Sequence, residues 1–325
     1  MTENLVPSLE TGNFRVLSLD GGGARGFLTA RILANIEHYV NSRTGSDKPL
    51  GDRFDLLVGT STGGIIALGL SIGKTANEIS SFYADLVPKI FSSKAQRASL
   101  FQYFEPKYSS DILKKELDTQ FGDSTLENVR TDVCITGVSL GLGKPRLHKS
   151  LYQTRYLDRQ KERLADIALA TSAAPTYFKA HRLRYSENII DGGIFANNPA
   201  IVGIVDAIAF ERPSKTRGKR TQKTSEVWLM SVGTGEQPTM PYDESRLVNA
   251  GLLDWAQHIA DVMMESQSAA VDYQARHLVP AEQYIRINPK LKRAFLLDDT
   301  ALHELNNYAD IREEYASVLD KFFSE

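Results

Sequence analysis

The chain has 325 residues, of which 42% are hydrophobic and 24% charged, a composition typical of an ordinary globular protein. Its 38 basic and 40 acidic residues give a net charge of -2, which excludes a general affinity for nucleic acid polymers or anionic surfaces, so any such affinity must be local. Cys134 is the only cysteine, which excludes an intramolecular disulfide and a thiolate metal cluster and fits a reducing compartment.

The N-terminal residues 1–13 are predicted to form a loose polar arm. They lack the basic stretch followed by an apolar core that marks a signal peptide. No run in the chain approaches 18 apolar residues, so no segment is predicted to span a bilayer. We therefore expect a cytoplasmic protein whose contact with a membrane is peripheral.

A predicted strand, a glycine-rich loop and a predicted helix come next. They are Phe14–Leu19, the loop Asp20–Gly26 with the sequence DGGGARG, and Phe27–Val40, whose apolar residues recur at helical spacing. The loop matches the dinucleotide fingerprint G-x-G-x-x-G, but the polar stretch Asn41–Asp52 stands where that fingerprint requires a second strand. The other interpretation is a loop whose backbone N–H groups hold an oxyanion.

A second strand, turn and helix follow in Phe54–Leu70. The apolar run Phe54–Val58 leads into Gly59-Thr60-Ser61-Thr62-Gly63, and a helical apolar run follows. This is the G-x-S-x-G pattern in the strand–turn–helix context of a nucleophile elbow. The pattern predicts that Ser61 projects its hydroxyl at the N-terminus of a helix, where developing negative charge is favoured.

The segment 86–108 combines aromatic and basic residues. It follows a predicted helix over Lys74–Tyr83 and precedes another over Asp111–Phe121. Two interpretations stay open: a surface connection whose aromatic residues pack on the core, and a mobile lid or membrane contact.

The middle of the chain is predicted to continue the alternation of strands and helices. The expected strands are Asp132–Leu140, Arg146–Tyr152 and Leu183–Ile190, and the expected helix is Arg163–Ala174, which Pro175 ends. The last of these strands leads into the loop Asp191-Gly192-Gly193.

The remaining elements are a helix over Pro199–Phe210, strands over Glu226–Val232 and Gln283–Ile287, a long helix over Leu252–Tyr273, and two final helices. The stretch 212–223 carries six basic residues and no acidic one, and it is either a solvated loop or a docking patch for an anionic lipid or nucleotide. The alternation predicts an α/β protein with a largely parallel sheet covered on both faces.

Three loops each follow a predicted strand: Asp20–Gly26, Gly59–Gly63 and Asp191–Gly193. The C-terminal ends of parallel strands share one edge of the sheet, where sites form. Ser61 would supply a nucleophile and Asp191 a base, since a short hydrogen bond in a dry site without a nearby cation raises the pKa of an aspartate from its usual value of about 3.9. The N–H groups of Gly22, Gly23 and Thr62 would stabilise an oxyanion.

A histidine base is the alternative to Asp191. Six histidines are present, and none lies in a glycine-flanked loop after a predicted strand. We expect each to be a surface or packed residue: His38, His148, His181, His258, His277 and His303. Clustered histidines and an aspartate-rich calcium loop are lacking as well, so we expect neither a metal nor a cofactor.

These motifs resemble those of the patatin-like phospholipase family, which combine a D-G-G-G-x-R/K-G loop, a G-x-S-x-G elbow and a D-G-G/A loop. The matching residues are Gly21, Gly22, Gly23, Arg25, Gly26, Gly59, Ser61, Gly63, Asp191, Gly192 and Gly193. The resemblance implies a three-layer α/β/α sandwich and a lipid acyl hydrolase with a Ser61–Asp191 dyad, whose oxyanion hole is shaped by Gly22, Gly23 and Thr62. It covers residues 14–235, the expected catalytic core, and 236–325 is expected to be a helical extension on the same domain.

The length and the cytosolic character also resemble those of bacterial patatin-like effectors of anti-phage defence. That resemblance implies a phospholipid substrate at a membrane surface and a cyclic dinucleotide or other anionic activator. The alternatives are a catalytically idle lipid-binding or scaffold protein on the same frame, and a dinucleotide-binding oxidoreductase. The sequence indicates no oligomeric state.

Overall fold

The computed structural model describes residues 13–92, 105–150, 159–184, 187–209, 212–214, 218–220, 223–239, 244–311 and 313–324. The strands are β1 (Phe14–Leu19), β2 (Leu56–Gly59), β3 (Asp132–Ser139), β4 (Lys144–Lys149), β5 (His181–Arg182), β6 (Asn188–Asp191), β7 (Arg212–Ser214), β8 (Gly218–Arg220), β9 (Val227–Val232) and β10 (Tyr284–Ile287). The helices are α1 (Gly26–Thr44), α2 (Thr62–Ser71), α3 (Ala76–Ile90), α4 (Asp111–Phe121), α5 (Leu164–Thr171), α6 (Gly193–Ala196), α7 (Ala200–Ala209), α8 (Glu244–Leu247), α9 (Leu252–Leu278), α10 (Leu302–Asn306) and α11 (Glu313–Phe323).

Eight strands form the central sheet in the order β10-β9-β1-β2-β3-β6-β5, with β4 paired to β3. The five strands from β10 to β3 are parallel, whereas β4 and β6 run antiparallel to β3. The parallel strands are apolar on both faces: Val16 and Leu17 are both fully buried, and so are Leu56 and Leu57. A strand buried on both sides requires such a run, because neither face meets water.

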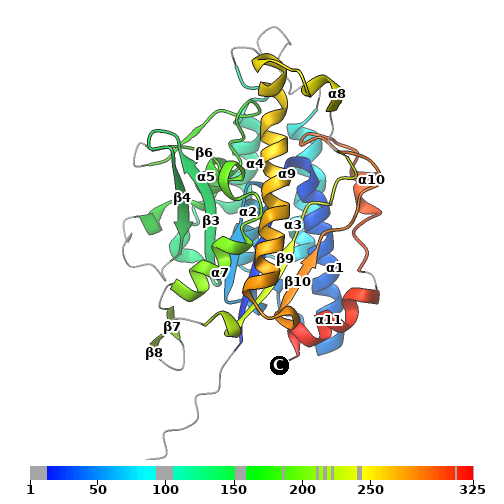
Figure 1. Ribbon diagram of the computed structural model, residues 1–325. Helices are drawn as coiled ribbons and strands as arrows, with labels where there is room; N and C mark the ends of the chain where they lie inside the picture. Colours follow the sequence, from blue (N-terminus) through cyan, green and yellow to red (C-terminus); the bar gives the residue numbers. More distant parts are fainter. Residues whose placement is uncertain are drawn as a thin grey trace, which may run out of the picture.

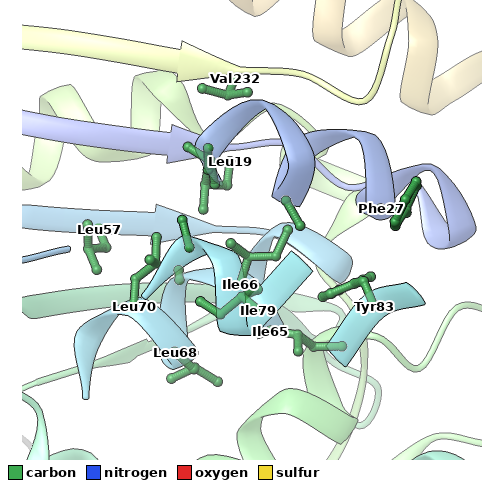
Figure 2. Close-up of a cluster of buried hydrophobic side chains, with 14 of the residues drawn as sticks. Leu19, Phe27, Leu57, Ile65, Ile66, Leu68, Leu70, Ile79, Tyr83 and Val232 are labelled. Atoms are coloured by element: carbon green, nitrogen blue, oxygen red, sulfur yellow. The ribbon is translucent and has the colours of Figure 1, made fainter. Parts of the chain in front are cut away.

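Helices cover both faces of this sheet, so the fold is the expected three-layer α/β/α sandwich (Figure 1). On one face α7 and α9 pack over β1, β2, β9 and β10. On the other face α1, α2 and α3 bury the larger core. Figure 2 shows Ile66 of α2 close to Leu19 of β1, and Leu70 of α2 close to Leu57 of β2.

The central parallel strands end at one level. Leu19 is aligned with Gly59 of β2 and with Val232 of β9, and Val232 is aligned with Ile287 of β10. The loops that follow these four residues therefore leave the sheet at the same edge. This edge carries the candidate site.

Most predicted elements are confirmed within a few residues, and the predicted bounds of two elements were wrong. The helix predicted over Lys74–Tyr83 continues to Ile90, because Leu86, Val87 and Ile90 extend its buried stripe and Pro88 is accommodated near its last turn. Of the strand predicted over Leu183–Ile190, only the end is a strand, β6, and it pairs with β5 (His181–Arg182), which lies just before the predicted range.

The segment 86–108 is described only at its two ends. Residues 86–90 are the last part of α3, and residues 93–104 lie outside the described residues. At the other end Lys107 forms an ion pair of 2.6 Å with Asp298, and the Tyr108 hydroxyl donates to the same carboxylate at 2.7 Å. Tyr108 also stacks on Tyr177, so both described ends of the segment are packed against the domain.

The basic stretch 212–223 contains the short antiparallel pair β7 and β8. Lys215 and Arg217, on which its charge partly depends, lie outside the described residues, as do residues 1–12 of the predicted N-terminal arm. None of the helices in the described part of the chain has the length and hydrophobicity that crossing a bilayer requires.

Candidate active site

Ser61 occupies the tight turn between β2 and α2. Its backbone has φ 53° and ψ -122°, a conformation that a residue with a side chain rarely adopts. The turn packs closely on the end of β1. A Cβ at Gly63 would therefore overlap the carbonyl oxygen of Leu19. The backbone N–H of Ser61 donates to the hydroxyl of Thr171 at 2.9 Å. This hydrogen bond to α5 stabilises the elbow predicted from the G-x-S-x-G pattern.

Asp191 reaches the same place by a route that the sequence did not predict. We expected it at the end of a parallel strand, but β6 is antiparallel to β3 and pairs only with the last three residues of β3, Gly137 to Ser139. The chain therefore runs towards the sheet from beyond the C-terminal end of β3, and Asp191 lies opposite Gly137. Its N–H donates to the carbonyl oxygen of Ala173 at 3.1 Å, just beyond α5.

The two side chains meet. The Ser61 hydroxyl donates to Asp191 Oδ2 at 2.6 Å, and the N–H of Gly193 donates to Asp191 Oδ1 at 2.7 Å. Ser61 is 8% exposed and Asp191 5%. Burial raises the pKa of Asp191 to about 6, and the two hydrogen bonds oppose that shift only in part. A carboxylate with this pKa is a stronger proton acceptor than an exposed aspartate.

The glycine loop after β1 lies beside this pair. Gly22, Gly23 and Thr62 line the same cavity as Ser61 and Asp191. Among the described residues, the N–H groups of Gly22 and Gly23 donate to no other group, and the N–H of Thr62 is the first of α2, so it has no acceptor within the helix. Gly23 has φ 57°, and a Cβ there would overlap the carbonyl oxygen of Leu297. Only glycine fits at this position.

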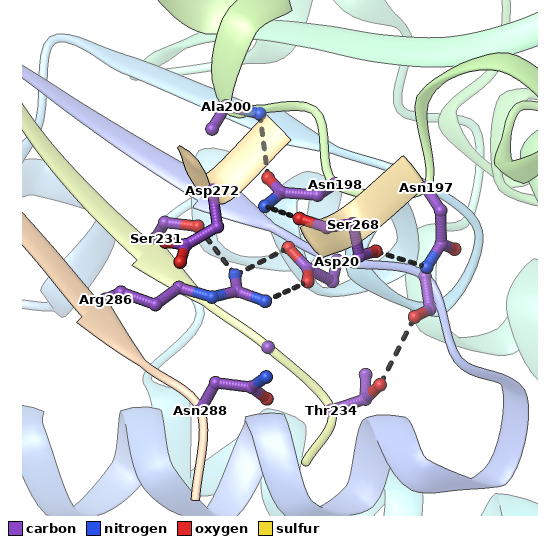
Figure 3. A network of polar contacts seen from close by, with 12 residues as sticks. Asp20, Asn197, Asn198, Ala200, Ser231, Thr234, Ser268, Asp272, Arg286 and Asn288 are labelled. Atoms are coloured by element: carbon purple, nitrogen blue, oxygen red, sulfur yellow. Dashed lines mark hydrogen bonds and ion pairs between the residues drawn. The ribbon is translucent and has the colours of Figure 1, made fainter. Parts of the chain in front are cut away.

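A buried ion pair fixes the start of the glycine loop. Arg286 of β10 donates to both carboxylate oxygens of Asp20, at 3.0 and 2.6 Å, and also to the hydroxyl of Ser231 (Figure 3). In the same network the hydroxyl of Thr234 donates to the carbonyl oxygen of Gly21 at 3.3 Å. The sequence placed Asp20 at the start of the glycine loop but gave no signal for Arg286, which is 266 residues away and belongs to no motif.

Helix α9 lies against the site through its middle. Arg25 of the glycine loop forms an ion pair of 3.1 Å with Glu265, and the side-chain amide of Asn197 donates to Ser268 at 2.9 Å. Met264, the residue before Glu265, lines the cavity of Ser61. Sequence reasoning missed these α9 residues, because their spacing is that of any amphipathic helix.

The cavity in front of Ser61 is apolar. Its other lining side chains are mostly large aliphatic and aromatic groups, namely Ile65, Tyr83, Leu86, Val87, Ile90, Phe91, Leu113, Tyr177, Phe178, Met264 and Leu297. Its volume is about 60 Å³, room for about two water molecules. Surroundings of this kind suit an acyl chain and exclude competing water.

None of the six histidines lines this cavity. The Nδ1 of His148, on β4, lies 2.8 Å from Glu162, and His181 contacts Asp166 at 3.2 Å. Among the described residues, no group of three or more histidine, cysteine or acidic side chains is placed to hold a metal ion.

Comparison with known proteins identifies the family of the chain. The family model described as "Patatin-like phospholipase" matches residues 17–204. Two "cGAMP-activated phospholipase" proteins are similar: that of Escherichia coli (strain TW11681) is 36% identical, with 70% of this chain and 64% of that protein covered, and that of Vibrio cholerae serotype O1 is 37% identical, with 69% and 65% covered. The chain thus spans a little under two thirds of the length of either relative.

A plant relative extends the match. "Patatin-like protein 2" of Arabidopsis thaliana is 31% identical, with 84% of this chain and 74% of that protein covered. The family model spans more than half of the chain and includes all three glycine-containing loops identified in the sequence. The chain therefore belongs to the patatin-like phospholipase family.

Proposed function

We propose that the protein is a lipid acyl hydrolase that cleaves phospholipid esters with Ser61 as nucleophile and Asp191 as general base. The observation that carries the proposal is the 2.6 Å hydrogen bond between these side chains at an apolar cavity. Family membership supports the same class of reaction.

In the first half of the reaction Asp191 takes the proton of the Ser61 hydroxyl while the serine oxygen attacks the ester carbonyl carbon. The tetrahedral oxyanion that forms is stabilised by the N–H groups of Gly22, Gly23 and Thr62. When the intermediate collapses, Asp191 returns the proton to the departing glycerol oxygen, and the acyl group stays on Ser61 as an ester.

In the second half Asp191 takes a proton from a water molecule, which attacks the acyl-enzyme. The same N–H groups stabilise the second oxyanion, and the fatty acid leaves as the proton returns to Ser61. No histidine, metal or cofactor takes part in this scheme.

Mutation of the two residues tests the scheme. Ser61→Ala and Asp191→Asn should each abolish nearly all hydrolysis of a soluble short-chain ester, and the double variant should be no worse than either single one, because the residues act as a unit. A serine-directed fluorophosphonate should label the wild type and not Ser61→Ala. If Asp191→Asn keeps more than about a tenth of the wild-type rate, the activation barrier has risen by less than about 1.4 kcal/mol and Asp191 is not the base. Absence of both labelling and hydrolysis in the wild type would indicate an idle lipid-binding protein.

We further propose that a cyclic dinucleotide switches the enzyme on, as an anionic activator. The support is that two relatives, at 36% and 37% identity, are described as cGAMP-activated phospholipases. Hydrolysis of mixed phospholipid vesicles, measured with and without cGAMP and a panel of other cyclic nucleotides, tests this. We expect weak activity alone and strong stimulation by one member of the panel. Full activity without any ligand would remove the regulatory proposal and leave the hydrolase proposal intact.

A further inference from the structure

We propose that exposed apolar side chains around the Ser61 cavity form the surface through which the protein binds a phospholipid bilayer. The inference rests on the proposed acyl hydrolase function for its choice of partner. The surface, here called the apolar rim, consists of Ile112, Ile194, Met263 and Leu296, which are between 36% and 46% exposed.

Each member of the apolar rim is close in sequence to a residue of the cavity. Ile112, Met263 and Leu296 immediately precede Leu113, Met264 and Leu297, whose side chains line it. Ile194 follows three residues after Asp191. Four separate elements of the chain therefore place one residue in the cavity and an apolar neighbour in water. A continuous apolar path from the surface to Ser61 is what an acyl chain leaving a bilayer requires.

The distribution of exposed apolar residues supports this location. Twelve large apolar side chains are exposed among the described residues, and nine of them lie at the C-terminal edge of the sheet or beyond it: the four of the rim, Leu140, Leu142, Val248, Trp255 and Ile259. The other three lie on α7 and on the C-terminal half of α9: Val205, Tyr273 and Leu278. Large exposed apolar groups gathered at one edge of a fold mark an interaction site.

Helix α9 extends this surface away from the sheet. Its residues Glu265 and Ser268 contact the loops at the edge of the sheet, so the residues before them project beyond it. Figure 1 shows this end of α9, with α8 beside it, well past the C-terminal ends of β9 and β10. Trp255, Ile259 and Met263 follow one another at intervals of four residues and therefore share one side of the helix. Tryptophan is a residue favoured at lipid–water interfaces.

A bilayer fits this surface better than a protein partner does. A protein seated on the rim would cover the entrance to Ser61, whereas a bilayer brings the substrate to it. The net charge of the chain is -2, so apolar insertion, rather than attraction of charge, would supply the affinity. This distinguishes the rim from the basic stretch 212–223, whose binding to lipid would weaken as salt screens it.

Vesicle flotation of the full chain tests the proposal. The parent is Ser61→Ala, which leaves the lipid intact, mixed with vesicles of phosphatidylethanolamine and phosphatidylglycerol, with and without cGAMP. The rim variant carries Ile112→Ser, Met263→Ser and Leu296→Ser. The matched control carries Val205→Ser, Tyr273→Ser and Leu278→Ser, also three exposed apolar residues. Circular dichroism and light scattering of each variant report folding and oligomeric state.

We expect the rim variant to lose about tenfold or more of vesicle binding, and the control to stay within about twofold of the parent. Raising NaCl to about 0.5 M should change binding of the parent by less than about twofold. Equal binding by the rim variant, an equal loss in the control, or binding that disappears in salt would overturn the proposal. So would a folded parent that does not bind vesicles in either condition, or a rim variant that changes only the oligomeric state.

The same experiment separates this inference from the proposed function. Vesicle binding is measured with the Ser61→Ala parent, in which catalysis is absent. Hydrolysis of a soluble ester is measured with the wild-type protein, without vesicles. Rim-dependent binding with no esterase activity would leave the docking surface and remove the hydrolase. Esterase activity without vesicle binding would do the reverse.

Discussion

Thr171 accepts the backbone N–H of Ser61 with its hydroxyl oxygen at 2.9 Å, although 110 residues separate the two in the chain. Thr171 is the last residue of α5 and is fully buried. Two residues later the carbonyl oxygen of Ala173 accepts the N–H of Asp191. The end of one helix thus binds the backbone of both members of the proposed dyad, which explains how a serine at φ 53° is kept facing its aspartate.

Replacing Thr171 with valine should separate this positioning role from packing. Valine fills the same space but leaves the N–H of Ser61 buried without an acceptor, which costs about 1–3 kcal/mol. We expect the free energy of unfolding, from urea titration, to fall by that amount, and kcat on a soluble ester to fall with little change in KM. Thr171→Ser, which keeps the hydroxyl, should restore most of kcat. If Thr171→Val and Thr171→Ser have the same kcat, the hydrogen bond does not position Ser61.

The sequence predicted the parts of the site that lie in local motifs. The turn at Ser61 is predicted by the glycines two residues before and after it. The glycine loop is predicted by three consecutive glycines, which neither a helix nor a strand favours. Both signals are short-range, and both loops leave the sheet where predicted.

The remaining parts depend on contacts between distant segments. Arg286 pairs with Asp20 across 266 residues, and Thr171 is an unremarkable threonine at the end of a helix. The direction of β6 could not be predicted either, because a strand of four residues, two of them apolar, has the same sequence pattern in parallel and antiparallel sheets. The pairing partners of such a strand are set by tertiary packing, which periodicity does not contain.

The raised pKa of Asp191 predicts the pH dependence of the reaction. Asp191 must be ionised to accept the serine proton, and burial raises its pKa to about 6. We therefore expect kcat/KM for a soluble, non-ionising ester to fall about tenfold per pH unit below that value and to level off above about pH 7. A stopped assay between pH 4.5 and 8.5 gives the profile. A midpoint near pH 4, the value of an exposed aspartate, would contradict the buried, cation-free setting of this carboxylate.

The same shift predicts that Asp191 destabilises the folded chain at neutral pH. Because its pKa is higher folded than unfolded, the folded state binds more protons between about pH 4 and pH 6, so this group makes stability fall as pH rises through that window. About two pKa units correspond to about 3 kcal/mol. Asp191→Asn, which can still accept the N–H of Gly193 and bond to Ser61, should therefore unfold at higher urea than the wild type at pH 7.5, and the difference should shrink towards pH 4.5. Lower stability of Asp191→Asn at pH 7.5 would contradict this prediction.

The ion pair between Asp20 and Arg286 should behave as a buried pair, since the side chains are 4% and 8% exposed. Arg286→Met leaves the Asp20 carboxylate buried without its partner, which costs about 3–5 kcal/mol, whereas the double variant Asp20→Asn, Arg286→Met removes the unpaired charge and should recover much of that loss. Lys89→Met is the control, because its ion pair with Glu116 is solvent-exposed on the lysine side and contributes about 1 kcal/mol or less. Urea unfolding of these three variants and the wild type measures the differences, and Asp20→Asn alone completes the double-mutant cycle. Since Asp20 begins the loop that carries Gly22 and Gly23, we also expect Arg286→Met to lower kcat on a soluble ester more than Lys89→Met does. A loss for Arg286→Met no larger than that of the control would show that the glycine loop holds its place without the ion pair.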